Sequence, residues 1–302
     1  MGSYQSNQCW QEIQSFLPLR NRLTDDIQLR EEAVYCGDIQ IHCDVYQPNY
    51  FKGTLILFHG ICGNGRLMSF LAVPFYRLGY RVICPDLPLY GYTETAKNIT
   101  YQDWIACAKE VVSYYHIENT FLFGTSLAGT LVYQIGALCK EVNGVMMTCL
   151  LDLNVEAICN EILNGTMMDR WLLSSSLPKL LKRKKVKIDT LLSLGGICNN
   201  EQILERMIKD KHAAGTKVSF EFLRTLFHPQ LPDPSCYPVP CLLMHPEKDR
   251  WIDFKYSEQL YYQIKASKRM VVIEGAGHFP IEAIGLSQIQ LEMLKFMKEF
   301  SV

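Results

Sequence analysis

The sequence lacks an excess of charge of either sign. Its 302 residues carry 30 Lys and Arg against 31 Asp and Glu, a formal net charge of −1. Proteins that bind nucleic acid or anionic membranes through their overall charge are usually strongly basic. The balance therefore excludes a global attraction to nucleic acid, and we expect no nucleic-acid partner.

The sequence also lacks long hydrophobic runs. No stretch approaches the ~18 consecutive apolar residues of a membrane-spanning helix. The amino-terminal stretch MGSYQSNQCWQEIQ has neither a basic start nor an apolar core, which excludes a secretory signal. Gly2 and Ser6 fit a loose acceptor pattern for myristoylation, and Cys9 could take a palmitate. The alternative is an ordinary frayed terminus or a cloning remnant.

Paired cysteine motifs are absent, although cysteines are numerous. None of the twelve forms a C-x-x-C pair, and most fall inside apolar segments, among them Cys36, Cys43, Cys62, Cys139, Cys149 and Cys159. This pattern favours buried free thiols over a disulfide framework, and it predicts a cytoplasmic location. His59 and His245 are interpreted as structural or loop histidines, because we find no carboxylate or thiolate partner at metal-ligand spacing. We expect no metal and no cofactor.

Buried strands alternate with amphipathic helices through the first half of the chain. IQIHCDVYQP alternates polar and apolar residues, as a half-exposed strand does, and residues 10 to 23 have a helical pattern. Solid apolar runs predict strands in GTLILFHG, RVICPD, NTFLFG and NGVMMTCLLD, with helices between them. Thr100, with Asp103 three residues on, predicts the start of one helix. The alternation predicts an α/β fold with a mostly parallel central sheet flanked by helices.

The pattern changes near residue 153. Helical stretches follow one another without a buried strand until the proline-rich connector HPQLPDPSCYPVP, after which strands and helices alternate again from CLLMHPEKD onward. We therefore predict a core formed by residues 1–152 and 237–302. Residues 153–236 are predicted to form a helical cap, or lid, inserted between the presumed sixth and seventh strands.

The stretch FLFGTSLAG, residues 121–129, places a serine where a buried strand turns into a helix. Its G-x-S-x-A pattern is close to the G-x-S-x-G nucleophile elbow, in which small neighbours permit a sharp turn. Such a turn lifts the hydroxyl of Ser126 above the carboxyl ends of the strands, beside a helix amino terminus. The alternative is a turn built of small residues, such as any α/β protein contains.

A serine nucleophile needs a base and a carboxylate to orient that base. His278, in VVIEGAGHFP, and Asp249, in CLLMHPEKDRW, both follow presumed strands and so lie at the edge of the sheet where sites gather. Asp152, Glu247 and Asp253 remain alternatives for the acid, with Asp152 the next choice. A loop histidine capping the last helix is the alternative for His278.

The stretch LFHGICGNG predicts one half of an oxyanion hole. Acyl transfer builds negative charge on a carbonyl oxygen, which two preorganised backbone N–H groups can stabilise. Leu127, after the nucleophile, and Ile61, in the loop after the third strand, are the predicted donors. His59-Gly60 would let the backbone of that loop approach the substrate, although the pair could also be a simple turn.

Four of these motifs, in this order, resemble the α/β-hydrolase superfamily and, within it, the monoglyceride lipase and lysophospholipase group. The quoted stretches LFHGICGNGRLMSFLAVPFYRLGYRVICPDLPLYGYTE, DKHAAGTKVSFEFLRTL, PVPCLLMHPEKDRWID and EGAGHF carry the resemblance, which covers residues 30 to 300. It implies an α/β-hydrolase fold, with a catalytic triad and an oxyanion hole at the positions named above. Three residues depart from the group's pattern: Ala128 and Pro246 stand where glycine is common, and Tyr90 stands where histidine is common.

The resemblance implies a serine esterase or lipase acting on a lipid-like ester, such as a monoacylglycerol or a lysophospholipid. Bulky apolar residues of the predicted cap are candidates for substrate binding: Met167, Met168 and Trp171. The basic run 182–185 indicates a solvated face or transient contact with a membrane surface. A thioesterase, an amidase, a carbon–carbon bond hydrolase and a non-catalytic binding protein of the same fold remain alternatives. Nothing in the sequence indicates an oligomeric state.

Overall fold

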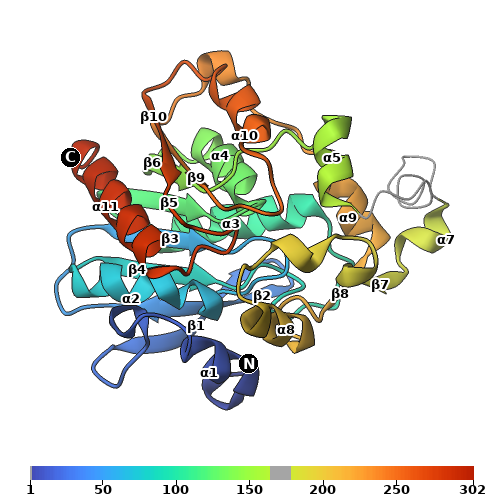
Figure 1. Cartoon of the computed structure of the whole chain (residues 1–302), viewed down its shortest axis with the longest axis horizontal. Coiled ribbons are helices and arrows are strands. Elements are labelled where there is room, and N and C mark those ends of the chain that lie inside the picture. The colour runs from blue at the N-terminus through green and yellow to red at the C-terminus, as the bar shows by residue number, and fades with distance from the viewer. Residues whose placement is uncertain (1, 164–177) are drawn as a thin grey trace.

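The computed structural model describes residues 2–163 and 178–302, and its centre is an eight-stranded sheet (Figure 1). The strands run in the order β1-β2-β4-β3-β5-β6-β9-β10. Strand β2 pairs antiparallel with β1 and β4, and the other pairs are parallel. The strands are β1 (Leu29–Cys36), β2 (Ile39–Tyr46), β3 (Thr54–Phe58), β4 (Arg81–Pro85), β5 (Thr120–Gly124), β6 (Val142–Met147), β9 (Cys241–Pro246) and β10 (Lys268–Ile273). The predicted fold class is confirmed.

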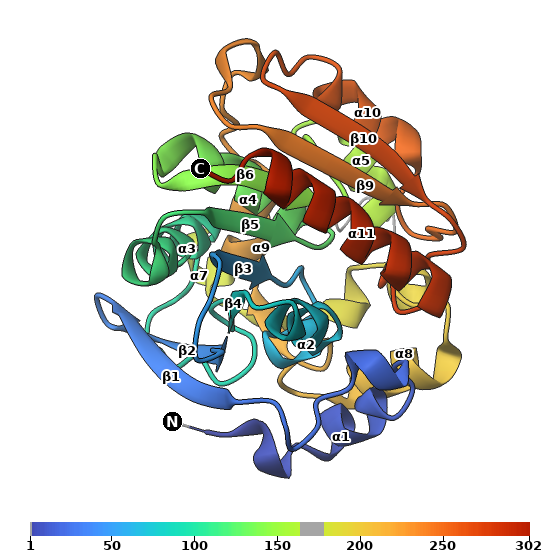
Figure 2. The same cartoon turned by 90° about the vertical axis from the view of Figure 1, so that its left-hand side faces the viewer.

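Helices cover both faces of this sheet. On one face lie α2 (Ser69–Arg77) and α11 (Ala283–Glu299), and on the other α3 (Tyr101–Tyr115) packs against α4 (Ala128–Leu138) (Figure 2). The other core helices are α1 (Gln8–Gln14) and α10 (Phe254–Tyr261). Helix α3 begins with the predicted capping box, in which Asp103 accepts a hydrogen bond from the backbone N–H of Thr100 at 2.8 Å.

The segment between β6 and β9 contains short helices and one small sheet. The elements are α5 (Glu156–Ile162), α7 (Lys179–Lys182), α8 (Glu201–Lys209) and α9 (Phe220–Leu226), with β7 (Lys185–Lys187) and β8 (Lys217–Ser219) pairing antiparallel. The expectation of helices alone is therefore wrong, because strands of three residues are too short to show a period in sequence. The predicted substrate-binding residues Met167, Met168 and Trp171 lie outside the described residues.

Three further elements differ from the sequence prediction. The helix expected over residues 10 to 23 ends at Gln14, and Pro18, which has no N–H for a helical hydrogen bond, follows in the next turn. Strand β1 was not predicted, since its edge position lets it carry Arg30, Glu31 and Glu32. Strand β10 is the other edge strand and is only half-buried, whereas the sequence indicated a buried strand.

A buried charge network ties the amino-terminal segment to the sheet. Asp86, directly after β4, accepts hydrogen bonds from the Tyr4 hydroxyl at 2.8 Å, the Gly65 N–H at 2.6 Å and the Tyr92 N–H at 2.8 Å. Burial raises the pKa of the Asp86 carboxyl, but the adjacent His42 and the backbone donors hold it below the ordinary value. The chain is therefore anchored from Tyr4 onward and is not frayed there.

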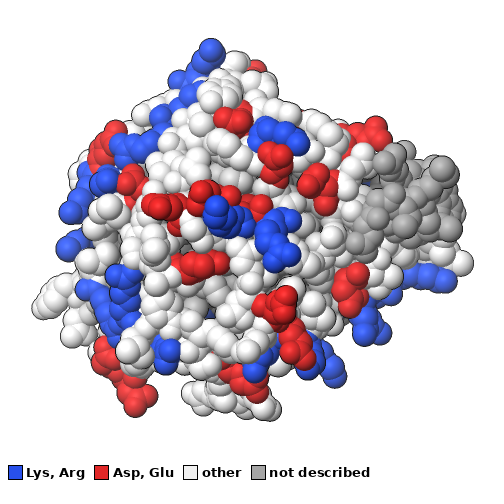
Figure 3. Space-filling model, viewed as in Figure 1, with Lys and Arg blue, Asp and Glu red and all other residues white. Residues whose placement is uncertain are grey.

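All twelve cysteines lie within the described residues, where they are free and mostly buried. Among the described helices, none combines the length and apolar composition needed to span a bilayer. Basic and acidic side chains are interspersed over the face seen in Figure 3. This mixture agrees with the near-zero net charge.

The first turn of α4 packs directly onto the chain that leaves β6. A Cβ atom added at Gly129 would stand 1.8 Å from the carbonyl oxygen of Cys149, a contact with rigid backbone. At Gly195 an added Cβ would meet nothing within 4 Å, and that glycine does not have a positive φ.

We therefore expect Gly129→Ala to lower the free energy of unfolding by about 1–3 kcal/mol or more, because the backbone at the start of α4 must shift. Gly195→Ala is the matched control and should leave it unchanged or slightly higher. Thermal or urea unfolding monitored by circular dichroism measures both. Equal stability of the two variants would contradict this account of the packing.

Candidate active site

Ser126 lies on a strained turn between β5 and α4. Its φ of +53° is in the left-handed region, which non-glycine residues seldom adopt. The turn closes tightly, since a Cβ at Gly124 would stand 2.1 Å from the carbonyl oxygen of Ala128. A Cβ at Gly60 would stand 2.9 Å from the Cβ of Ser126. These two glycines permit the conformation, whereas the methyl group of Ala128 is buried without forcing the turn open.

His278 connects Ser126 to Asp249. The His278 Nε2 atom lies 2.7 Å from the Ser126 Oγ, and its Nδ1 atom lies 2.8 Å from Asp249 Oδ2. The other carboxylate oxygen, Oδ1, accepts the backbone N–H groups of Trp251 and Ile252, each at 2.9 Å. Nδ1 must carry a proton to donate to the carboxylate, which leaves the Nε2 lone pair facing the serine hydroxyl.

Asp249 is held in its charged form. Its side chain is 1% exposed, and this burial raises the pKa of the carboxyl. The His278 ring and the two backbone N–H donors lower that pKa more strongly, so that it lies below the ordinary aspartate value. Pro246 does not disturb this loop, because the next residue continues the ladder with Glu247 N–H donating to the Ile273 carbonyl at 2.9 Å.

The alternative acids are engaged elsewhere. Asp152 accepts hydrogen bonds from the backbone and side chain of Asn154. Asp253 accepts the backbone N–H of Lys255 and caps α10. Glu247 is exposed and accepts the N–H of Gly275. None of these carboxylates hydrogen-bonds to His278 in the described structure.

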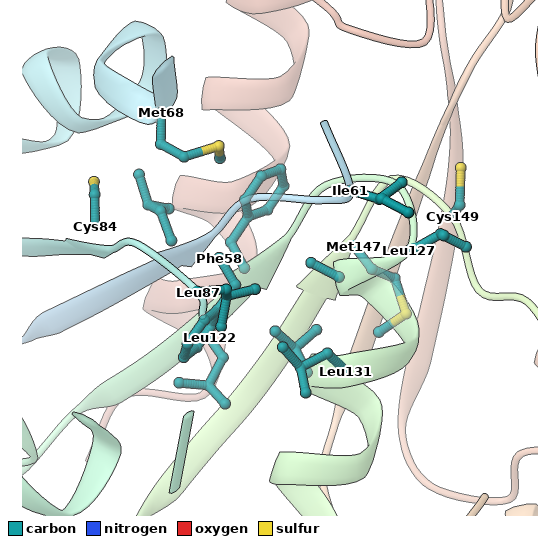
Figure 4. Packing of buried hydrophobic residues seen from close by; sticks show 14 of the residues in the cluster. Phe58, Ile61, Met68, Cys84, Leu87, Leu122, Leu127, Leu131, Met147 and Cys149 are labelled. Atoms are coloured by element: carbon teal, nitrogen blue, oxygen red, sulfur yellow. The ribbon is translucent and has the colours of Figure 1, made fainter. Parts of the chain in front are cut away.

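Two backbone N–H groups flank the serine without an acceptor. Within the described chain, neither Ile61 nor Leu127 donates its N–H to another protein atom. Figure 4 shows their side chains close together at the carboxyl ends of the strands. Free backbone N–H groups beside a nucleophile are what an oxyanion hole is built from, so Ile61 and Leu127 remain the candidate donors.

His59 orients the peptide that carries one of these donors. Its Nε2 accepts the Leu87 backbone N–H at 2.9 Å, so its Nδ1 must bear the proton and donate to the Gly60 carbonyl oxygen, 2.8 Å away. Burial lowers the pKa of His59, which keeps the ring neutral. Because C=O and N–H point opposite ways across one peptide, holding the Gly60 carbonyl directs the Ile61 N–H to the other side. Tyr90 packs edge-on against the His59 ring.

The cavity beside Ser126 is small and mostly apolar. It holds about 30 Å³, the space of one or two water molecules. Ile197 and Met207, from the segment between β6 and β9, form part of its wall together with residues of the core, including Met68, Trp251 and Phe279. The Trp251 ring also meets the His278 ring edge-on, with centroids 4.8 Å apart.

Sequence reasoning missed several neighbours of the serine. Thr148, directly after β6, accepts the Ser126 backbone N–H at 2.9 Å. Cys149 and Asp249 each place a ligand atom close to a ring nitrogen of His245, with all three atoms within 4.8 Å of one another. The sequence showed no thiolate or carboxylate at metal-ligand spacing from His245, and the structure brings Cys149 and Asp249 near its ring. Cys149 is distant from His245 in sequence and meets it because β6 and β9 pair side by side, whereas Asp249 follows His245 closely in the chain.

Comparisons with known proteins agree with this fold. The model described as "Alpha/beta hydrolase family" matches residues 55–283, and the chain belongs to this family, as its motifs predicted. No curated protein matches the chain by sequence. Among solved structures, a soluble variant of monoglyceride lipase from Saccharomyces cerevisiae, in complex with a substrate analogue, is 17% identical with a TM-score of 0.72, and the match covers 95% of this chain and 99% of that one.

Two further solved structures are similar to this chain. Carboxylesterase CesB from Bacillus subtilis is 16% identical with a TM-score of 0.64, over 96% of each chain. Est1E from Butyrivibrio proteoclasticus, solved with ferulic acid bound, is 16% identical with a TM-score of 0.62, over 89% of this chain and 98% of that one. At these identities the likeness shows a shared fold.

The pairing of Asp249 predicts a pH-dependent stability. The folded pKa of this carboxyl lies below its value in the unfolded chain, ~3.9. Its charge therefore stabilises the fold above about pH 4, and this contribution is lost as the pH falls through the folded value. Asp249→Asn should unfold more easily than the wild type at pH 6, and the difference should shrink below about pH 4. Urea unfolding across this pH range tests it, and a difference that grows on acidification would contradict it.

Proposed function

We propose that the protein is a serine hydrolase that cleaves a carboxylic ester through an acyl-enzyme on Ser126. The observation that carries the proposal is the continuous hydrogen-bonded line from Ser126 Oγ through His278 to Asp249, with links of 2.7 and 2.8 Å. A serine, an imidazole and a charged carboxylate in this order are the components of nucleophilic acyl transfer.

In the first half-reaction, His278 Nε2 takes the proton of Ser126 as the Oγ attacks the ester carbonyl. Asp249 stabilises the imidazolium that forms. The carbonyl oxygen becomes negative and accepts hydrogen bonds from the backbone N–H groups of Ile61 and Leu127, which are in place before the reaction begins. The tetrahedral intermediate collapses as His278 gives its proton to the leaving alcohol, and the acyl group stays on Ser126.

In the second half-reaction, water takes the place of the alcohol. His278 removes a proton from this water, which attacks the acyl carbon of the ester on Ser126. The same N–H groups stabilise the second oxyanion. The intermediate releases the carboxylic acid, and His278 returns the proton to Ser126 Oγ, which restores the starting state.

We propose a lipid-like substrate, such as a monoacylglycerol or a lysophospholipid. Support comes from the apolar cavity wall formed by Met68, Met207 and Phe279, and from the likeness to a monoglyceride lipase. Residues 153–236 would act as the lid over this cavity. The basic run 182–185, with Leu180 exposed beside it, would make transient contact with a membrane surface inside the cytoplasm. A thioester, an amide or a carbon–carbon bond would use the same groups.

A fluorophosphonate probe should label Ser126 covalently, because an activated serine attacks phosphorus as it attacks a carbonyl. Ser126→Ala should not be labelled. Asp249→Asn should lower kcat for a short ester on the order of 10⁴-fold, since His278 then takes the wrong tautomer. Asp152→Asn is the matched control and should keep its kcat. Folded wild-type protein that resists the probe would instead indicate a non-catalytic binding protein.

Chain-length dependence tests the lipid-like substrate. Burying one CH₂ contributes ~0.8 kcal/mol, so kcat/KM should rise up to about fourfold for each acyl carbon added until the site is full. Met207→Ala should flatten this rise and leave a two-carbon ester nearly unaffected, because Met207 lines the wall and does not react. Met270→Ala, on the edge strand β10, is the control. A flat profile in the wild type would make the protein a small-ester hydrolase.

A further inference from the structure

A second cluster of reactive side chains lies behind the acid of the proposed triad. Cys149 follows β6 by two residues, His245 is on β9, and Asp249 follows β9. Strands β6 and β9 are parallel neighbours, so both chains emerge at the same edge of the sheet. One sulfur, one ring nitrogen and one carboxylate oxygen come within 4.8 Å of one another there.

These three groups are the ligand types that Zn²⁺ prefers in proteins. His245 is 3% exposed, and its Nδ1 has no hydrogen-bond partner among the described residues. Asp249 accepts three hydrogen bonds, and a carboxylate has about four lone-pair sites. It therefore has a lone pair left for a cation.

A separate cavity reaches two of these three groups. It has a volume of about 460 Å³, and both His245 and Asp249 line it. Its lining includes three exposed carboxylates, those of Glu161, Glu247 and Asp253. It includes one guanidinium group, so negative charge predominates. Lysines outside the lining pair with two of these acids. Ser126 and His278 line the other cavity, so a cation could approach the acid without crossing the substrate site.

We propose that Cys149, His245 and Asp249 bind Zn²⁺ and that binding inhibits the enzyme. The metal displaces the proton of the Cys149 thiol: the S–H bond breaks, a Zn–S bond forms, and H⁺ passes to water. The metal draws the Asp249 carboxylate away from His278, which weakens the base. The inhibition rests on the proposed function, whereas the binding does not.

The other cluster of similar composition is less suited to a metal. Glu31, His42 and Asp44 also come within 4.8 Å of one another. Arg66, however, already lies between two of them, with contacts of 2.5 Å to Asp44 and 2.6 Å to Glu31. A cation would have to displace this buried guanidinium, so the group is a structural ion network.

Cobalt binding tests the site without reference to catalysis. Co²⁺ added to chelator-treated protein should produce the thiolate-to-cobalt charge-transfer absorption in the near ultraviolet, and Zn²⁺ should abolish it by competition. Cys149→Ala should lose the absorption. Cys241→Ala, which removes another buried thiol at the start of β9, should keep it. His245→Phe is the second variant, in case Cys149→Ala fails to fold. Absence of the absorption in wild-type protein overturns the site.

Hydrolysis of a short ester tests the inhibition. Saturating Zn²⁺ should lower the wild-type kcat at least about tenfold, because His278 loses the carboxylate that orients it. EDTA should reverse the loss, and Mg²⁺, which prefers oxygen ligands, should not cause it. The ratio of rates with and without Zn²⁺ should be near one for Cys149→Ala. Equal inhibition of both proteins overturns the proposal, as does cobalt binding without inhibition. Cobalt binding by a protein with no hydrolysis would refute the proposed function and keep the site.

Discussion

The left-handed conformation of Ser126 is the constraint on which the site depends. A non-glycine residue at φ +53° is strained, and this conformation persists only where the surrounding structure enforces it. Here the neighbours leave no other room, since Gly124 and Gly129 bring the start of α4 against β5 and against the chain after β6. The hydrogen bond from the Ser126 N–H to Thr148 fixes the turn from the other side. The backbone strain at Ser126 is thus offset by packing on both sides of β5.

The groups around the serine are supported by deeper polar contacts. Asp86 accepts hydrogen bonds from the Tyr4 hydroxyl and from the Gly65 N–H, which joins the amino-terminal segment to the loop after Ile61. The charge of Asp86 is compensated by these donors and by His42, at 3.0 Å, so its burial is not prohibitive. The amino-terminal segment also contacts the other side of the site. Glu12, on α1, pairs at 2.7 Å with Arg206 of α8, the helix that carries Met207.

Much of the fold could be predicted from the sequence, because strands such as β3 and β5 are buried on both faces and read as solid apolar runs. Ser126 and Asp249 could be proposed for the site because each follows such a strand, and His278 because it follows the apolar run of the edge strand β10. Strand β1 was not predicted, because an edge strand of the sheet tolerates charged side chains and therefore lacks an apolar pattern. The proximity of Cys149 to His245 and the hydrogen bond from Leu87 to His59 follow from the spatial order of the strands, which no local pattern encodes.

The small volume beside Ser126 has a kinetic consequence. A space that holds one or two waters is smaller than an acyl chain, so the proposed ester would reach the serine only if Ile197 and Met207 moved. Association is then gated: its rate is the frequency of encounter multiplied by the fraction of time the wall is open. Release of the proposed carboxylic acid product would require the same movement. If bond breaking is fast, the motion of this wall would set the turnover rate of the proposed hydrolysis.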